Sequence, residues 1–286
     1  KANLGPIVGT VQPDCLFDTN TGKTDCSNWS ESAHWDIPAD AVSGIYVAKL
    51  VRTDGGENHI TFVVRNYAGN SPILYNTSDG TWQAYNVYGG HSLYCGSFTD
   101  NQGVTFSHAV KVSYQRPFIT RFNGCVGSYA EWFRNAEYPL IRWMERNGYN
   151  VSYTTQQDMS RDATPITPAM HKIIISAGHD EYWSSECRTK WETARNNGVN
   201  VCFMSGNEIY WKTRWEDNYQ TMVCYKEGTL GEYNCGGKCD PTLNWTGLWR
   251  DGCGTSYITI DGCNNENQLT GQMSWTGSES FITVPD

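Results

Sequence analysis

Apolar residues in the first third of the chain gather in short, β-branched runs that predict strands. The segments GIYVAKLVR (44–52) and HITFVVRNY (59–67) flank the turn TDGGEN, and this arrangement is typical of a hairpin. A shorter strand is expected at 73–75, where an apolar run ends in the polar segment NTSDGTWQAYN.

The middle of the chain alternates between helical and strand patterns. Apolar side chains between 140 and 144 recur at helical spacing before an Asn-Gly stop at 147–148, and the short strand NVSYT follows. The continuous apolar runs HKIIISAG (171–178) and VNVCFMSGNE (199–208) predict strands buried on both faces. Between them we expect a helix with Ser184 or Ser185 as its N-cap and Asn197-Gly198 as its end. This order predicts an α/β fold with a doubly wound, mostly parallel sheet and added β-hairpins.

The two ends of the chain are rich in turn residues and carry little periodicity. Residues 1–42 are expected to form a disulfide-tied arm, and 43–286 a single α/β domain. Its loop-rich, cysteine-containing lobe is placed at about 216–286, with strands predicted only at 220–227, 255–261 and 280–284.

Composition narrows the range of partners and compartments. A net charge of -9 and a pI near 5.1 argue against nucleic acid and anionic membranes as partners, and no apolar stretch is long enough to span a bilayer. Eleven cysteines indicate an oxidising compartment, so we expect a secreted protein. The pairs Cys15/Cys26, Cys235/Cys239 and Cys253/Cys263 lie in turn-rich segments suited to disulfides, with zinc as the less favoured alternative. Sequons at Asn28, Asn76, Asn150 and Asn244 permit glycosylation.

Polar clusters follow three of the predicted strands. They are NTSDGTWQAYN after 73–75, GHDEYW after 173–176 and SGNEIYW after 201–204. Because ligands bind at the carboxyl ends of strands in open α/β sheets, these clusters predict a site there. The candidate residues also have simpler structural interpretations: Tyr182 as a packed aromatic, Glu208 as a carboxylate at a helix N-terminus, and His179 as a capping residue.

The chemistry of this predicted site is narrowed by the motifs that the chain lacks. No Ser or Cys flanked by glycines occupies the strand-to-helix turn, and neither a Walker loop nor a G-x-G-x-x-G follows a strand. A hard metal ion held by carboxylate and phenolate oxygens remains possible, and it would act as a Lewis acid.

Several ordered motifs resemble one known family. SGIYVAKL, TSDGTWQAYNVYGGHSLY, VSYQRPF, EYPLIRWMERNGYNVSYTT, HKIIISAGHDEYWSSECR, ARNNGVNVCFMSGNEIYWKTR and VCYKE are similar, in this order, to the catalytic domain of the N,N-dimethylformamidase large-subunit (beta subunit-like) family. The resemblance spans roughly 43–275. It implies a glutamine-amidotransferase-like sheet and a mononuclear iron, held by two tyrosines and a glutamate, that activates water for attack on an amide.

Carried over by position, the resemblance implies Tyr182 and Tyr138 as iron ligands. Glu227 follows the family order as the carboxylate ligand, and Glu208 competes with it. His179 is implied beside the metal, where it would handle protons. Asp180 stands where the characterised amidase has proline, and we include it among the candidate catalytic residues with His179 and Glu208.

These observations support a secreted, metal-dependent hydrolase acting on C–N bonds of small amides. The rival is a non-catalytic extracellular glycan-binding or structural protein that retains the fold, for which twelve Trp and seventeen Tyr could stack on sugars. Calcium bound by Asp and Asn in the loops near 14–28 or 251–267 is a third possibility.

Overall fold

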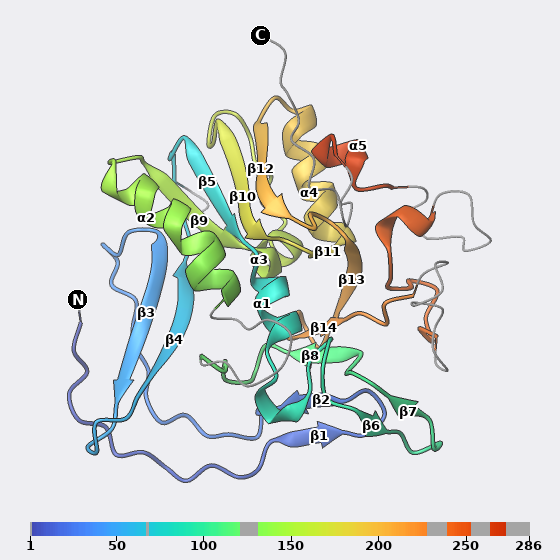
Figure 1. The fold of residues 1–286 in the computed structure, drawn as a ribbon. Coiled ribbons are helices and arrows are strands. Elements are labelled where there is room, and N and C mark those ends of the chain that lie inside the picture. The colour runs from blue at the N-terminus through green and yellow to red at the C-terminus, as the bar shows by residue number, and fades with distance from the viewer. Residues whose placement is uncertain (1, 67–68, 121–130, 228–238, 253–263, 273–286) are drawn as a thin grey trace.

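A parallel sheet lies at the centre of the molecule. The computed structural model describes residues 2–66, 69–120, 131–227, 239–252 and 264–272. The sheet has the order β12-β10-β5-β9 (Figure 1) and is built from β5 (Ile73–Thr77), β9 (Val151–Thr155), β10 (Ile173–His179) and β12 (Asn200–Gly206). All three neighbouring pairs run parallel. The mixed α/β architecture with parallel strands is therefore confirmed.

Apolar side chains of the central strands alternate between two cores, one on each face of the sheet. On one face, Leu74 and Ile174 pack with residues of α3 (Gln156–Arg161) and α4 (Ser185–Asn196). On the other, Tyr75 and Ile175 pack with α2 (Tyr138–Arg146) and the preceding π-helical turn η2 (Glu131–Glu137). Because successive strand residues point to opposite faces, continuous apolar runs serve both cores.

The predicted boundaries of the long helices are confirmed by their caps. Ser184 is the N-cap of α4, where its hydroxyl accepts a hydrogen bond from the N–H of Cys187, and the helix ends at Asn197. The helix α2 has a proline in its first turn and ends at Asn147, just before Gly148, whose φ of 73° lies in the left-handed region.

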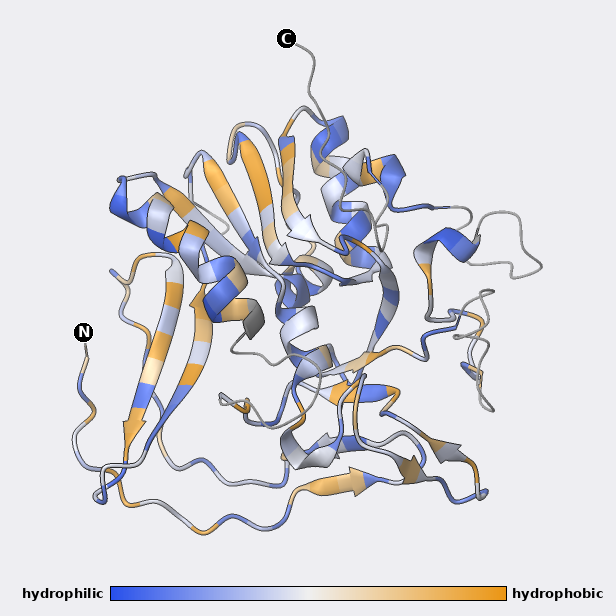
Figure 2. Ribbon diagram, in the orientation of Figure 1, coloured by the Kyte–Doolittle hydropathy of each residue, from blue (hydrophilic) through white to orange (hydrophobic). Residues whose placement is uncertain are grey.

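One strand differs from the prediction. The run VNVCFMSGNE was expected to be buried on both faces, but β12 lies at the edge of the sheet and Met204 is 56% exposed. The apolar colouring of β12 in Figure 2 resembles that of β5 and β10. Hydropathy alone therefore could not separate this edge strand from its buried neighbours.

A second sheet lies beyond the carboxyl ends of the central strands (Figure 1). Its order is β11-β13-β14-β8, and it consists of β11 (Tyr182–Ser184), β13 (Trp211–Glu216), β14 (Thr221–Val223) and β8 (Lys111–Ser113). The helix α1 (Asp79–Tyr85) follows β5 directly, and its Ala84 and Tyr85 pack with Trp211 and Met222 of this sheet. The smaller elements are η1 (Tyr88–Gly90), β6 (Phe98–Thr99), β7 (Thr105–Phe106), η4 (Trp249–Gly252) and α5 (Asn267–Thr270).

The N-terminal part contains two hairpins. The predicted hairpin is confirmed as β3 (Gly44–Val51) and β4 (Glu57–Val64), which pair antiparallel at the left of Figure 1. The arm carries β1 (Leu16–Asp18) and β2 (Lys23–Asp25), and the predicted Cys15–Cys26 disulfide is present. Both other predicted cysteine pairs, and the strands expected at 255–261 and 280–284, include residues outside the described ranges. Among the described helices, none is long and apolar enough to cross a membrane.

Candidate functional site

The strand order creates a natural binding position at the carboxyl ends of β5 and β10. The chain passes from β5 to β9 on one side and later to β10 on the other, so the direction of winding reverses between β5 and β10. Ligands in open α/β sheets bind at such a reversal. At this edge, β5 leads into Thr77-Ser78-Asp79 and β10 leads into the segment from His179 to Tyr182.

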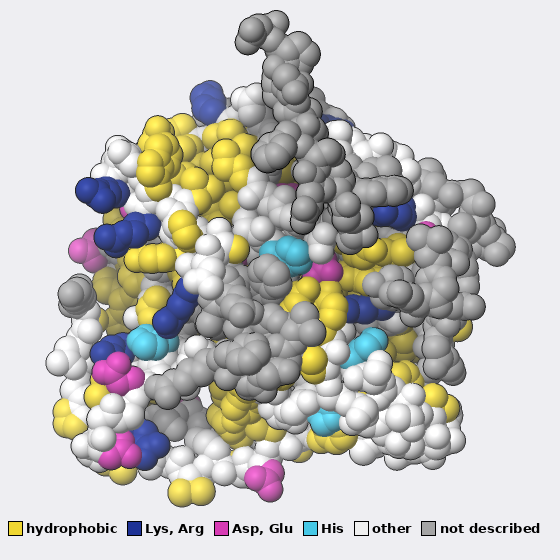
Figure 3. All heavy atoms as spheres, viewed as in Figure 1, with side chains coloured by type: hydrophobic (Ala, Val, Ile, Leu, Met, Phe, Trp, Pro, Cys, Tyr) yellow, Lys and Arg dark blue, Asp and Glu magenta, His cyan; other side chains and the backbone are white. Residues whose placement is uncertain are grey.

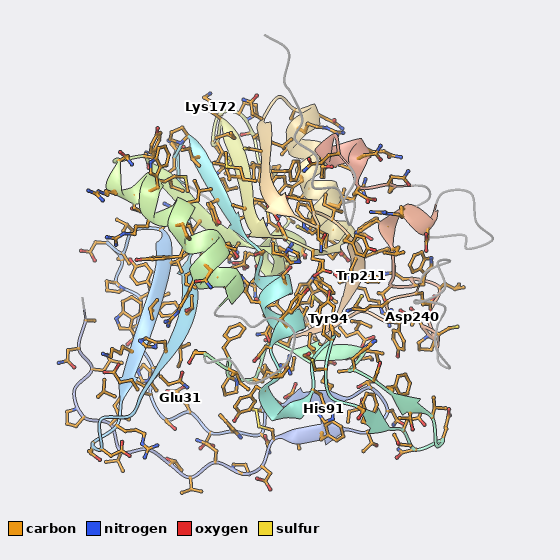
Figure 4. The ribbon with its side chains drawn as sticks, in the orientation of Figure 1. Glu31, His91, Tyr94, Lys172, Trp211 and Asp240 are labelled. Atoms are coloured by element: carbon orange, nitrogen blue, oxygen red, sulfur yellow. A yellow bond between two sulfur atoms is a disulfide. The ribbon has the colours of Figure 1, made fainter. Side chains whose placement is uncertain are left out.

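Glu181 is the centre of a buried polar cluster at this edge. Its carboxylate accepts hydrogen bonds from the hydroxyls of Tyr85 (3.0 Å) and Tyr94 (2.5 Å) and from Nε1 of Trp211 (3.0 Å). His179 Nε2 lies 3.3 Å from the same carboxylate, and the His179 side chain is 12% exposed. Figure 4 shows Tyr94 and Trp211 next to each other near the centre of the molecule, between β13 and α1.

The charge of Glu181 is stabilised by these neighbours. Burial on its own would raise the pKa of this carboxyl, but the hydrogen bond and charge of His179, the charge of Lys226 and the Tyr94 hydroxyl together hold the pKa below its usual range. Glu181 is therefore an ionised carboxylate in contact with a histidine that reaches the surface. Figure 3 shows a histidine beside an acidic side chain near the middle of this face.

Tyr182 lies in the same cluster and is 1% exposed. Its hydroxyl is buried and has no hydrogen-bond partner among the described residues, and its ring meets the Tyr94 ring edge-on at 6.3 Å. Burial, with Tyr94 and Glu181 nearby, raises the pKa of Tyr182 well above its usual range. A phenolate at this position would require a cation beside it.

The other two predicted iron ligands have different surroundings. Tyr138 begins α2 and is 43% exposed, and its hydroxyl accepts a hydrogen bond from Arg142 at 3.4 Å. The carboxylate of Glu227 is buried and accepts a hydrogen bond from the N–H of Asp240. In the described part of the chain, then, Tyr182 lies in the cluster around Glu181, whereas Tyr138 and Glu227 make their contacts elsewhere. The described His, Cys, Asp and Glu residues likewise form no group of three that could hold a metal ion.

Asp180 and Glu208 are buried behind the cluster. Asp180 accepts hydrogen bonds from the Ser176 hydroxyl and from the side-chain amide of Gln156. Both carboxyl oxygens of Glu208 are buried and, within the described residues, accept no hydrogen bond. Burial raises the pKa of each group well above its usual range, and Asp180 adds to the effect on Glu208. The two flanking residues of Glu208, Asn207 and Ile209, have positive φ values of 51° and 53°.

Glu137 is a buried carboxyl that sequence reasoning did not single out. It directly precedes Tyr138 and accepts hydrogen bonds from Trp82 Nε1 (2.6 Å), the Tyr75 hydroxyl (3.2 Å) and the Ser78 hydroxyl. Burial raises its pKa to about 8, although these hydrogen bonds oppose the rise. Gly178 has a φ of 88°, and a Cβ there would lie 2.7 Å from Glu137 Cγ, so glycine allows this close approach.

The residues missed by sequence reasoning had weak signals. Glu181 carries no local sequence signal of this cluster, because its partners Tyr85, Tyr94 and Trp211 come from separate segments of the chain. Glu137 lies next to Tyr138, and the resemblance points to the tyrosine and not to the carboxyl. The family-like motif TSDGTWQAYNVYGGHSLY contains both Tyr85 and Tyr94, so it is the sequence signal that points to these two residues.

Comparison with known proteins identifies the family of this chain. The family model described as "N,N-dimethylformamidase beta subunit-like, C-terminal" matches residues 2–285. The N,N-dimethylformamidase beta subunits of Alcaligenes sp and Paracoccus aminophilus are each 26% identical to the chain over 145 residues, which is 50% of this chain and 18% of each relative. The matched stretch thus spans less than a fifth of these relatives. The match over nearly all of its length places the chain in the N,N-dimethylformamidase beta subunit-like, C-terminal family.

Proposed function

We propose that this chain hydrolyses the C–N bond of small amides at the cluster formed by His179, Glu181 and Tyr182. The relatives are named for N,N-dimethylformamidase, and the family match supports amide hydrolysis as the reaction class. We also propose that the parallel sheet is the doubly wound, glutamine-amidotransferase-like sheet implied by the resemblance. Helices on both faces and the reversal of winding at β5 and β10 support this assignment.

The contact between His179 and Glu181 is the observation that carries the proposal. Amide hydrolysis needs a group that accepts a proton from the attacking water and later returns it to the departing amine. The His179 imidazole reaches the surface while its Nε2 lies 3.3 Å from the Glu181 carboxylate, which can orient the ring. In the proposal His179 exchanges these protons, and Glu181 is held ionised for this role.

The iron centre is a further part of the proposal. When bound, such an ion would polarise the amide carbonyl and lower the pKa of water. The unpartnered hydroxyl of Tyr182 supports a ligand role, with Tyr138 and Glu227 or Glu208 as the other ligands that the resemblance implies. Because the described residues do not bring this set together, the roles of His179 and Glu181 are derived without the metal.

Export to an oxidising compartment also belongs to the proposal. Support comes from the Cys15–Cys26 disulfide and from Cys95 and Cys239, which are also disulfide-bonded. Among the described residues, the free thiols of Cys187 and Cys224 are buried, and that of Cys202 is partly buried. Labelling of the native chain with a thiol reagent before and after reduction would count the disulfides. Full labelling of Cys15 and Cys26 before reduction would contradict the proposed export to an oxidising compartment.

The test uses purified protein, N,N-dimethylformamide as the probe substrate, and release of dimethylamine as the readout. Tyr182→Phe removes only the unpartnered hydroxyl, so the fold should be retained while activity falls by about 100-fold. Tyr46→Phe is the matched control, because the Tyr46 hydroxyl donates to the Val42 carbonyl on the distant β3 hairpin and activity should not change.

Metal analysis accompanies this assay. A ferric-tyrosinate protein should show a visible absorption band that Tyr182→Phe weakens. Protein purified with no metal and no colour would remove the iron centre from the proposal, and wild-type protein with no activity on a panel of small amides would overturn amide hydrolysis itself.

A further inference from the structure

Lys226 is a buried lysine inside the same cluster, and the functions considered so far do not use it. The residue is 5% exposed, and its Nζ lies 3.2 Å from the centre of the Tyr94 ring. The same atom is 5.2 Å from the centre of the Trp211 ring and 5.7 Å from that of Tyr182. Three aromatic faces therefore surround one ammonium group, an arrangement that stabilises a cation through ring quadrupoles.

The backbone around Lys226 is arranged to direct this side chain inward. Lys226 has a φ of 54°, which is in the left-handed region that side-chain-bearing residues rarely adopt. Its two neighbours are anchored on the same residue: the N–H of Tyr225 donates to the Thr246 hydroxyl at 2.8 Å, and the N–H of Glu227 donates to the Thr246 carbonyl at 3.1 Å. Strained residues held in this way concentrate at functional positions.

The ammonium faces one ionised partner but does not form a hydrogen bond with it. The charge of Lys226 acts on Glu181, and the other titratable groups that interact with Lys226 are Cys224 and His108. Across the described residues, Lys226 Nζ donates no hydrogen bond, whereas the Glu181 carboxylate is occupied by Tyr85, Tyr94 and Trp211. An ammonium has three donors, and in a side chain this buried they are available to water or to the oxygen of a bound ligand.

We propose that Lys226 is a further catalytic residue of this site, whose ammonium binds the acyl oxygen of the amide and stabilises the negative charge that develops on it. The inference rests on the proposed amide hydrolysis, because it names the group that receives the carbonyl oxygen in that reaction. As water adds to the carbonyl carbon, the C=O double bond becomes a single bond and its oxygen becomes an oxyanion. The ammonium donates a hydrogen bond to this oxygen without giving up its proton.

The same geometry predicts binding of the carboxylate product. Formate, the acid released from a formamide, carries its charge on oxygens equivalent to the acyl oxygen. A fixed ammonium caged by apolar rings should bind such a small anion better than the neutral amide. Formate binding therefore gives a readout of Lys226 that does not require turnover.

The experiment compares Lys226→Met, Lys226→Arg and the control Lys212→Met in the full chain. Lys212 is also a buried lysine over tryptophan rings, but its Nζ donates to the Asn244 side chain at 2.9 Å instead of facing the cluster. We expect Lys226→Met to lower kcat for N,N-dimethylformamide by about 100-fold with little change in KM. Lys226→Arg should recover part of the loss, because it keeps a donor and the charge, and Lys212→Met should retain wild-type kcat.

Sodium formate binding, measured by calorimetry on the same proteins, separates the possible failures. Formate affinity should fall by about tenfold or more in Lys226→Met and remain unchanged in Lys212→Met. Unchanged kcat and unchanged formate affinity in a folded Lys226→Met protein would overturn the inference while leaving amide hydrolysis intact. An inactive wild type that still binds formate through Lys226 would overturn the proposed hydrolysis and keep the anion-binding role. If the Lys226→Met protein does not fold, kcat and formate affinity are compared between Lys226→Arg and the wild type. Wild-type values of both in Lys226→Arg would contradict the proposal that Lys226 is a hydrogen-bond donor of defined geometry.

Discussion

Several buried carboxyl groups lie at the sheet edge, and their pKa values differ because their neighbouring residues differ. Glu181 has cationic neighbours and a depressed pKa, while burial raises the pKa of Asp79 to about 6 and that of Glu137 to about 8. Asp79 accepts hydrogen bonds from the N–H of Gln156 and from the Tyr114 hydroxyl, which tie α1 to α3 and to the segment after β8. Carboxyl groups with raised and with lowered pKa values thus occur at the same edge of the sheet.

Asp79 should make stability fall as the pH rises. Its folded pKa of about 6 lies above the ordinary aspartate value of 3.8, so the folded state binds more protons than the unfolded state between these values. Over this window the contribution of Asp79 to the free energy of unfolding of the wild type decreases with pH. Asp79→Asn removes the titrating carboxyl. The free energy of unfolding of this variant, relative to that of the wild type, should therefore increase by about 2 kcal/mol between pH 4 and pH 6. Urea titrations at a series of pH values measure this difference, and a pH-independent difference would contradict the raised pKa.

Single residues were predictable from sequence where a local pattern carried the signal. Tyr182 and His179 follow an apolar strand directly, and the structure brings both to one cluster. Glu181 and Lys226 belong to the cluster through contacts with Tyr85, Tyr94 and Trp211, which are distant from them in the chain. Such convergence depends on how the two sheets meet, and hydropathy does not report it.

At the scale of elements, helix ends were the most predictable features because their signals are local. Ser184 illustrates this: its hydroxyl accepts from the Cys187 N–H at 3.2 Å and pairs with the Ser160 hydroxyl at 2.8 Å. The exposed edge of β12 was not predictable, because its run of apolar residues resembles that of β10. An edge position is set by strand order, which a single strand does not encode.

Ser184→Ala should lower the free energy of unfolding by about 1 to 2 kcal/mol. The change removes the acceptor at the N-terminus of α4 and also the hydroxyl contact that links α4 to α3. Thr189→Ala, at an exposed position of the same helix, is the control and should change stability by about 0.5 kcal/mol or less. Chemical denaturation followed by tryptophan fluorescence gives both values, and equal effects of the two changes would argue against the cap.

At the scale of the whole molecule, residues 21–26 of the N-terminal arm are bonded to the second sheet and the segments next to it. The N–H of Cys26 donates to the Gln115 carbonyl, that of Val110 donates to the Thr21 carbonyl, and Lys23 pairs with Asp217 at 3.0 Å. The arm was predictable as a disulfide-tied segment from its turn residues and cysteines. Its docking place was not, because the contacts join residues that are far apart in the chain.

Loss of the Cys15–Cys26 disulfide should therefore destabilise the described domain and not the arm alone. The bond closes a loop with a sequence separation of 11, and constraint of the unfolded chain by such a loop is worth about 3 kcal/mol. Since β2 lies against β8, the arm and the second sheet should unfold together. In the double variant Cys15→Ser/Cys26→Ser we expect one calorimetric transition, lowered by about 5 to 10 °C. A separate low-temperature transition with an unchanged main transition would instead mean that the arm unfolds independently, and that its contacts with Gln115 and Asp217 contribute little to the body of the protein.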